Sequence, residues 1–169
     1  MTAGDPSGRR PEARIGLISD THGHLRPEVF DALAGVERVI HAGDVEDPDH
    51  LTDLAAIAPV TGVSGNVDGH AVRAVVPEEV VFDAAGVRVA VIHGHQVHPD
   101  YRRLLARFPD ARVIVHGHTH APRCDRVGNV LIVNPGAAGQ AQKGHPPSVA
   151  ILEVVGGEPT VRHVELDQA

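Results

Sequence analysis

Aromatic side chains and cysteine are scarce in this sequence. Three phenylalanines and one tyrosine, with no tryptophan, are too few for a platform that stacks nucleic-acid bases. The single cysteine, Cys124, excludes an intramolecular disulfide and a cysteine-based zinc or iron–sulfur cluster. No apolar run approaches the roughly 18 residues of a membrane-spanning helix. A reducing, cytoplasmic environment away from membranes is therefore expected.

Positive charge is also in deficit. Fifteen Lys and Arg residues face 22 Asp and Glu residues, so the net charge is -7 with neutral histidine. That charge repels polyanions and disfavours long nucleic acid as a partner. A hydrophobic fraction of 42% suits a folded chain, and 169 residues suit one domain. We expect a disordered leader over residues 1–13, with no secretory signal, and a single domain over 14–169.

Apolar periodicity predicts a mixed architecture. In the first part, short β-branched runs alternate with helical stretches, as in parallel βαβ units. Strands are expected at 14–19, 38–41 and 60–64, with helices at 27–34 and 48–58 between them. Later segments predict a strand pair within 80–94, a helix at 100–108, a strand at 112–116, and hairpins joining 122–125 to 129–133 and 148–155 to 160–165. The predicted fold class is α/β (α+β), as a four-layer α-β-β-α sandwich whose last third forms antiparallel ribbons.

What the sequence has in excess is histidine, with 13 in all and six between positions 93 and 120. Side chains that can bind metal follow five predicted strands at the point where each strand ends: Asp20 and His22, Asp44, Asn66, His93, and His118 with His120. Taken singly, Asp20 could cap a helix, Asp44 and Asn66 could belong to turns, and His93 could be a hydrogen-bonded core histidine. Because parallel strands deliver their carboxyl ends to one edge of a sheet, the set as a whole favours a metal site there.

The ligand types narrow the choice of metal. Carboxylate, imidazole and amide oxygen suit manganese first, and also iron, zinc, nickel or cobalt. Seven side chains exceed what one ion uses, so two divalent ions are expected. With Asp20 and Asp44 as the two carboxylates, such a centre keeps a net positive charge and attracts phosphate.

The ordered motifs resemble those of the calcineurin-like metallophosphoesterases: Asp20-x-His22, Gly43-Asp44, Gly65-Asn66-x-Asp68, His93-Gly94 and Gly117-His118-x-His120. The short chain, the form of the third motif and the later Asn134-Pro135-Gly136 are similar to the small bacterial and archaeal phosphodiesterases of the YfcE type. The resemblance extends over nearly the whole chain.

The resemblance implies a division of the ligands between two ions. One ion would be held by Asp20, His22 and His120. The other would be held by Asn66, His93 and His118, with Asp44 bridging the two. A metal-bridging hydroxide would then attack phosphorus in line, so the implied activity is hydrolysis of a small phosphodiester.

One position departs from the wider superfamily. Many relatives carry a histidine after the asparagine of the third motif, which is thought to protonate the leaving group, whereas this chain has Val67. We expect His95, or in second place Asp68, to supply that proton. His95 could instead orient the metal cluster, and Asp68 could be a turn residue or orient a histidine.

Two other functions stay open at this point. A phosphomonoesterase would use the same centre, although the absent histidine favours diesters. A eukaryotic retromer subunit resembles the same small family yet serves as an interaction scaffold, so the fold does not prove catalysis. Retention of all seven ligand positions favours the enzyme. The antiparallel ribbons could also leave a strand edge that pairs with a second copy in a homodimer.

Overall fold

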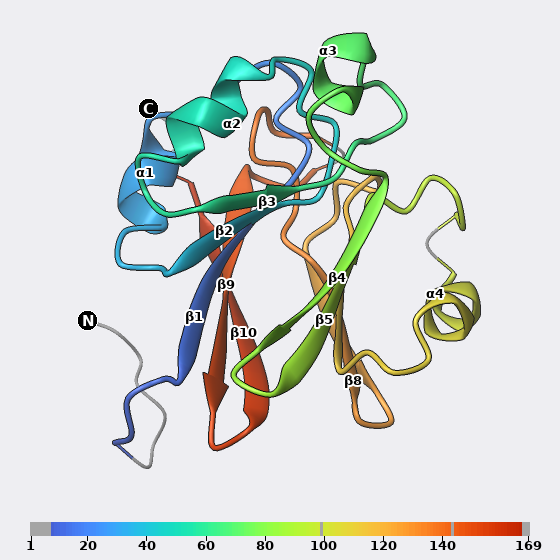
Figure 1. The fold of residues 1–169 in the computed structure, drawn as a ribbon. Helices are drawn as coiled ribbons and strands as arrows, with labels where there is room; N and C mark the ends of the chain where they lie inside the picture. The colour runs from blue at the N-terminus through green and yellow to red at the C-terminus, as the bar shows by residue number, and fades with distance from the viewer. Residues whose placement is uncertain (1–7, 99, 143, 167–169) are drawn as a thin grey trace.

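The computed structural model of the chain describes residues 8–98, 100–142 and 144–166, and it contains two five-stranded sheets. The first sheet has the spatial order β10 (Glu158–Glu165), β9 (Ser148–Val155), β1 (Ala13–Ile18), β2 (Arg38–His41) and β3 (Val60–Gly62). The second has the order β4 (Glu79–Ala84), β5 (Val87–Ile92), β6 (Val113–Val115), β8 (Val130–Asn134) and β7 (Arg123–Val127). The two sheets face each other across the molecule (Figure 1).

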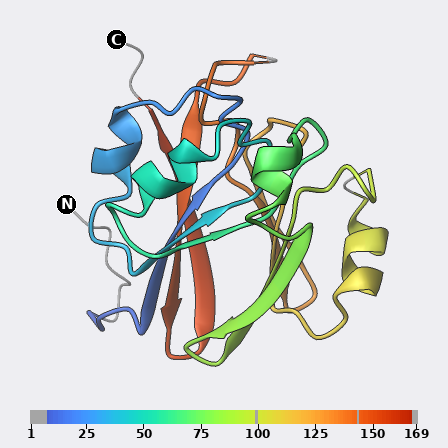
Figure 2. The same ribbon diagram turned by 45° about the horizontal axis from the view of Figure 1, so that its top comes forward.

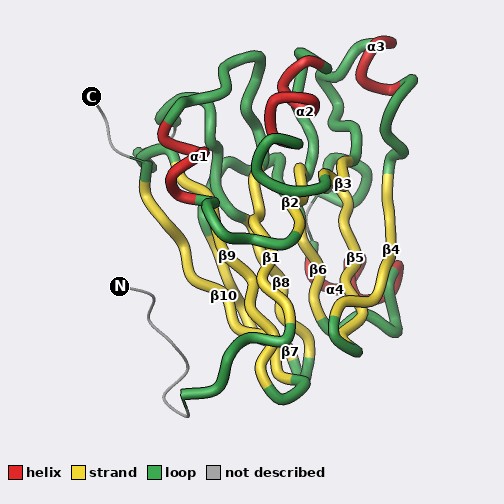
Figure 3. The backbone as a smooth tube through the Cα atoms, turned by 60° about the vertical axis from the view of Figure 1, so that its left-hand side comes forward, coloured by secondary structure: helices red, strands yellow, loops and turns green. Residues whose placement is uncertain are grey.

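Each sheet combines parallel and antiparallel strand pairs. In the first sheet β1, β2 and β3 are parallel, and β9 runs antiparallel to β1. In the second sheet β5, β6 and β8 are parallel, with β4 and β7 antiparallel at the edges. The parallel strands therefore end at one side of the molecule, where Figure 3 shows the connecting loops gathered.

Three apolar clusters define four layers. The cluster between the sheets contains β-branched residues from both, such as Ile40 and Val91. Outside the first sheet lie α1 (Glu28–Ala32) and α2 (Asp49–Leu54), which bury Val29 and Leu54. Outside the second sheet lies α4 (Tyr101–Arg107), which buries Leu104. Figure 2 shows these helices on opposite flanks, so the predicted α-β-β-α sandwich is confirmed.

The expected helix over 48–58 is shorter than predicted, since α2 ends at Leu54 and the chain continues in turns. Pro59 disfavours the helical conformation at Ala58, so the helix could not have reached its predicted end. A single-turn helix that was not predicted, α3 (His70–Arg73), follows the third strand. In the part of the chain that the structure describes, none of the helices reaches the length and apolarity that a membrane crossing needs.

The predicted hairpin of 122–125 with 129–133 is confirmed as β7 and β8, but β8 also takes part in a parallel pair that was not predicted. This strand pairs antiparallel with β7, but it also lies parallel to β6, with Ile114 opposite Ile132. Both faces of β8 are buried, which suits its unbroken apolar run Val130 to Val133. The place of β8 between β6 and β7 brings Asn134, at the end of β8, beside the loop that follows β6.

The first strand begins one residue before the start that was expected from the sequence. β1 begins at Ala13, and the backbone N–H of Glu12 donates to the carbonyl of Val154 at 2.7 Å. The Glu12 side chain also accepts from the backbone N–H of Gly156. Residues 1–7 of the expected leader lie outside the described residues.

Candidate metal centre

The structure brings all seven predicted ligands to the side of the molecule where the parallel strands end. Four of them, Asp20, His22, Asp44 and His120, each place one ligand atom so that the four atoms lie within 4.8 Å of one another. The shortest separations join Nε2 of His120 to Oδ1 of Asp20 and to Nε2 of His22, both at 3.2 Å. Asp20, His22 and His120 form the first ligand group, and Asp44 adjoins it.

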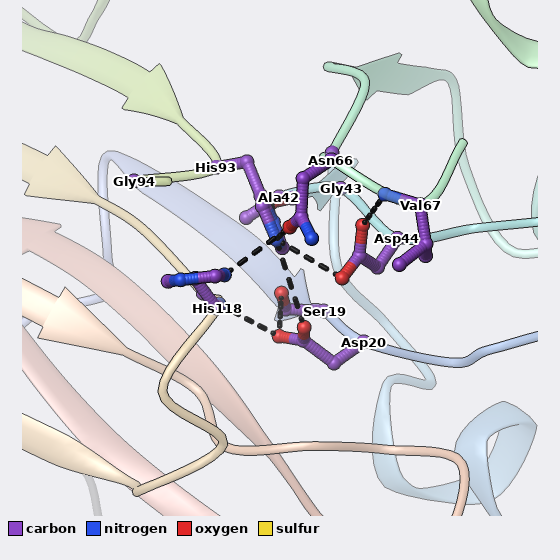
Figure 4. A network of polar contacts seen from close by, with 12 residues as sticks. Ser19, Asp20, Ala42, Gly43, Asp44, Asn66, Val67, His93, Gly94 and His118 are labelled. Atoms are coloured by element: carbon purple, nitrogen blue, oxygen red, sulfur yellow. Dashed lines mark hydrogen bonds and ion pairs between the residues drawn. The ribbon is translucent and has the colours of Figure 1, made fainter. Parts of the chain in front are cut away.

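The second ligand group consists of Asn66, His93 and His118. The amide oxygen of Asn66 lies 3.1 Å from Nε2 of His93 and 3.2 Å from Nδ1 of His118. Asp44 stands between the groups, because its Oδ2 is 3.1 Å from Nε2 of His93 and 3.8 Å from Nε2 of His22. Figure 4 shows Asp20, Asp44, Asn66, His93 and His118 pointing toward one another.

The hydrogen bonds around the histidine rings indicate which nitrogen is left for a cation. Nδ1 of His93 donates to the carbonyl of Ala42 at 2.8 Å, and Nδ1 of His22 donates to Glu46 at 3.0 Å. In a neutral ring, Nε2 then carries a lone pair, and it faces other acceptors across the centre. The Oδ1 atom of Asp20 is buried there with no hydrogen-bond partner among the described residues. Lone pairs and carboxylates that converge in this way fit divalent cations.

In the chain without bound ions, the pKa values of Asp44 and His93 follow from the same arrangement. Burial raises the pKa of Asp44, but the hydrogen bond and charge of His93 outweigh it and leave the pKa below its ordinary value. Burial lowers the pKa of His93, but Asp44 and Asp20 outweigh it and leave the pKa raised. The two groups therefore attract a proton between them, for the same reason that they would attract a metal ion.

Backbone conformation at the centre is unusual. Five of the seven predicted ligands have a positive φ, namely Asp20, His22, Asp44, His118 and His120. Residues with side chains adopt this left-handed region at a cost, and such strain clusters at functional sites. None of these residues caps a helix: α1 is preceded by Pro27, and the capping alternative for Asp20 is excluded.

Two glycines are needed where loops approach closely. A Cβ atom on Gly65 would lie 2.1 Å from Oδ1 of Asp44. Gly43 has a φ of 100°, and a Cβ there would lie 2.6 Å from Nδ1 of His93. The Gly-Asp and Gly-Asn pairs of the motifs thus leave room for the ligands beside them.

Asp68 does not point its carboxylate into the centre. Its Oδ2 accepts from the backbone N–H groups of Gly65 at 2.7 Å and Asp44 at 3.0 Å, and its Oδ1 accepts from Glu46 at 2.7 Å. The side chain is 4% exposed. Asp68 therefore ties the loop after β2 to the loop after β3.

His95 lies at the rim of the second ligand group. Its ring centroid is 5.6 Å from that of His93 and 6.3 Å from that of His118. Burial, and next the charge of His93, lower the pKa of His95. Its Nδ1 is buried without a hydrogen-bond partner in the described segments, so this atom is not engaged in holding the fold.

Sequence reasoning missed two residues that contact the ligands from outside. Glu46 accepts from Nδ1 of His22, and Oε1 of Gln142 accepts from Nδ1 of His120. Neither belongs to a recognisable motif. Glu46 stands in an acidic stretch with Asp47 and Asp49, and nothing in the local pattern distinguishes it from them.

Comparisons with known proteins agree with this geometry. A family model described as calcineurin-like phosphoesterase superfamily domain matches residues 14–157. A probable metallophosphoesterase of Methanothermobacter thermautotrophicus is 37% identical over 151 residues, which cover 84% of this chain and 86% of that protein. A phosphodiesterase of Methanocaldococcus jannaschii is 28% identical over 157 residues, covering 83% of this chain and 92% of that protein. The structure of Vacuolar Protein Sorting 29 from Cryptosporidium parvum is 25% identical, with a TM-score of 0.74, and covers 92% of this chain and 98% of that one.

Proposed function

Because the chain belongs to the calcineurin-like phosphoesterase superfamily, as its ordered motifs predicted, we propose that it is a metal-dependent phosphodiesterase acting on a small phosphodiester. Membership of the family points to a hydrolase of phosphoesters. The relative in Methanocaldococcus jannaschii that is named a phosphodiesterase supports the choice of diesters.

The observation that carries this proposal is the sharing of Asp44 between two ligand groups. Oδ2 of Asp44 lies within 3.8 Å of a histidine nitrogen from each group. Two divalent cations would fit between these acceptors, and manganese is the first choice for their identity. One cation would be held by Asp20, His22 and His120, and the other by Asn66, His93 and His118. Such a pair of cations supplies a hydroxide nucleophile at neutral pH and neutralises charge on phosphoryl oxygens.

The chain itself contributes position and charge. Asp20 and Asp44 are buried, so their orientation is held before substrate arrives. Two carboxylates against two divalent cations leave a net positive centre, and this attracts a phosphodiester despite the net charge of -7 on the whole chain. The same overall charge favours a small substrate over long nucleic acid.

For the leaving group, His95 suits proton donation better than Asp68. The Asp68 oxygens already accept three backbone N–H groups, so this carboxylate is engaged in holding two loops together and does not face the centre. The lowered pKa of His95 makes its acid form scarce as the pH rises above that value. Turnover that depends on protonated His95 should therefore fall with rising pH on substrates with a poor leaving group.

Two further parts of the proposal concern the surroundings of the chain. A cytoplasmic location agrees with the single cysteine, Cys124, which is exposed and unpaired by a disulfide. A second copy of the chain could pair with a strand edge of the antiparallel ribbons, such as that of β10 or β7, each the terminal strand of its sheet.

The decisive experiment combines metal analysis with paired substrates. Metal content of the purified protein is measured, and hydrolysis of an aryl phosphodiester is compared with that of the matching aryl phosphomonoester, with and without added manganese. An Asp44→Asn variant tests the shared ligand, and Asp47→Asn serves as a control on the same loop. A His95→Gln variant is assayed on esters of good and poor leaving groups.

The proposal expects about two ions per chain, metal-dependent cleavage of the diester over the monoester, and loss of both properties in Asp44→Asn but not in Asp47→Asn. His95→Gln should slow only the ester with the poor leaving group. Preference for the monoester would support a phosphomonoesterase instead. Bound metal without turnover would support the interaction scaffold, and absence of metal binding would reject the proposal.

A further inference from the structure

Glu46 contacts a metal ligand but offers no ligand atom to the centre. Its Oε2 accepts a hydrogen bond from Nδ1 of His22 at 3.0 Å. The opposite ring nitrogen, Nε2, lies 3.8 Å from both Oδ1 of Asp20 and Oδ2 of Asp44. The imidazole of His22 therefore lies between a carboxylate outside the centre and two carboxylates within it.

The backbone holds Glu46 in an unfavourable conformation. Its φ is 66°, in the left-handed region that residues with a Cβ avoid. The backbone N–H of Glu46 donates to Oδ1 of Asp68 at 2.7 Å, which anchors the residue in this conformation. The same buried carboxylate also accepts from the N–H of Asp44. The position of Glu46 is thus fixed together with that of the shared ligand.

A second histidine of the same ligand group has an outer partner of the same kind. Nδ1 of His120 donates to the side-chain oxygen of Gln142, and its Nε2 faces Oδ1 of Asp20 at 3.2 Å. Two loops far apart in sequence thus supply an acceptor to the outer nitrogen of a ligand histidine. An acceptor on the outer nitrogen thus occurs at two of the ligand histidines. This recurrence indicates that the outer contacts serve the metal centre.

We propose that Glu46 is a positioning residue that holds His22 with its proton on Nδ1 and its Nε2 lone pair directed at the metal; this inference rests on the metal-dependent function proposed above. A carboxylate on the outer nitrogen fixes the tautomer and the ring orientation and makes the ligand nitrogen more basic. Glu46 acts on the cation through His22 alone.

The competing interpretation is an ordinary surface ion pair. The Glu46 side chain is 43% exposed and that of His22 is 26% exposed, so a bond between them adds little to the stability of the fold. The two interpretations therefore differ in metal binding rather than in folding. Asp47 offers a matched control, because it lies on the same loop, is 48% exposed and approaches only His50 among the ion pairs of the described residues.

The test measures manganese affinity by competition with a chelator for the parent chain and for the variants Glu46→Leu, Glu46→Gln and Asp47→Asn. Thermal unfolding of each metal-free chain is measured alongside, and the visible absorption of bound cobalt reports the ligand geometry. Glu46→Leu removes the acceptor, whereas Glu46→Gln keeps an acceptor oxygen and removes only the charge.

We expect Glu46→Leu to weaken manganese binding about 10-fold to 100-fold and to change the cobalt spectrum. Glu46→Gln should recover part of the affinity, and Asp47→Asn should match the parent. Unfolding temperatures of the metal-free chains should agree. Parent-like affinity and spectrum in Glu46→Leu would overturn the positioning role while leaving the proposed function intact. A parent chain that binds no metal would overturn both.

Discussion

Asp68 is a buried carboxylate whose hydrogen bonds come from the backbone N–H groups of Asp44, Glu46 and Gly65. These donors belong to the two loops that carry Asp44 and Asn66. Because buried donors left without an acceptor are costly, the side chain stabilises both loops at once. Its contribution to activity is therefore expected to pass through the position of the ligands.

Replacement of Asp68 by Ala should lower the free energy of unfolding by about 3 kcal/mol, since two buried donors and one partly buried donor lose their acceptor. Bound metal should be lost in parallel. Urea unfolding and metal analysis of the same preparations test this expectation. A variant with parent-like stability and metal content, but slower cleavage of poor leaving groups, would instead identify Asp68 as the acid.

His41 contacts Thr21 and Gly43, which are the neighbours in sequence of three candidate ligands. Its Nδ1 accepts from the N–H of Gly43 at 3.2 Å, so its proton lies on Nε2, 3.0 Å from the hydroxyl oxygen of Thr21. The ring is fully buried, and burial is the main cause that lowers the pKa of His41 to about 4. The folded chain thus keeps this histidine neutral at a pH where the unfolded chain protonates it.

The stability of the chain should consequently fall below neutral pH. The folded pKa of about 4 lies below the unfolded value of 6.5, so the stability is complete above 6.5 and is lost as the pH falls toward 4. At pH 5 the loss from this group is about 2 kcal/mol relative to pH 7. Urea unfolding of the metal-free parent and of His41→Gln at both pH values measures it. Equal losses in parent and variant would contradict the assignment to His41.

The loop after β3 shows how close packing restricts which residue type can occupy a position. Gly65 and Gly69 both belong to this loop, but a Cβ atom on Gly65 would collide with Asp44, whereas none of the surrounding atoms lies within 4 Å of a Cβ on Gly69. The glycine of the Gly-Asn motif is thus set by close approach to the shared ligand. The second glycine, directly before α3, is under no such steric limit.

Gly65→Ala should displace the Asp44 carboxylate, lower the free energy of unfolding by about 2 kcal/mol and reduce bound metal. Gly69→Ala should change the free energy of unfolding by at most about 1 kcal/mol and leave metal content unaltered. Denaturant unfolding and metal analysis of both variants make the comparison. Similar behaviour of the two variants would show that the close approach to Asp44 is relaxed in solution.

Considering the molecule as a whole, the two sheets meet at a centre that concentrates buried acceptors. Asp20 and Asp44 are 0% and 2% exposed, and each lies against histidine nitrogens. Folding brings these groups together, and the unfolded chain does not. Cations that bind at the centre should therefore stabilise the fold as well as support activity.

Manganese at about 100 times its dissociation constant should raise the free energy of unfolding by about 2.7 kcal/mol. For a chain of this length the unfolding temperature should rise by about 5–10 °C. Scanning calorimetry with manganese and with chelator measures the shift, and His120→Ala should reduce it. An unfolding temperature that does not respond to either treatment would argue against metal binding in the folded state.

Local patterns along the chain were sufficient for the fold class and the family. β-Branched runs and their spacing predicted most strands, because alternation and burial leave a direct trace in neighbouring residues. The positions after the strands predicted which side chains would converge, since parallel strands end at a common edge. The boundaries of α2, the presence of α3 and the place of β8 were not predicted, because capping signals were weak and strand order depends on partners remote in sequence.

What needed the tertiary structure is the set of contacts between distant segments. The bond from Asp44 to Asp68 joins residues 24 positions apart, as does that from His22 to Glu46, and His120 lies 22 positions from Gln142. No periodicity or motif encodes such pairs, since each depends on how two loops from different strands pack. The candidate ligand types can therefore be identified from the sequence, whereas the side chains that contact them from outside become apparent only when the two sheets are assembled.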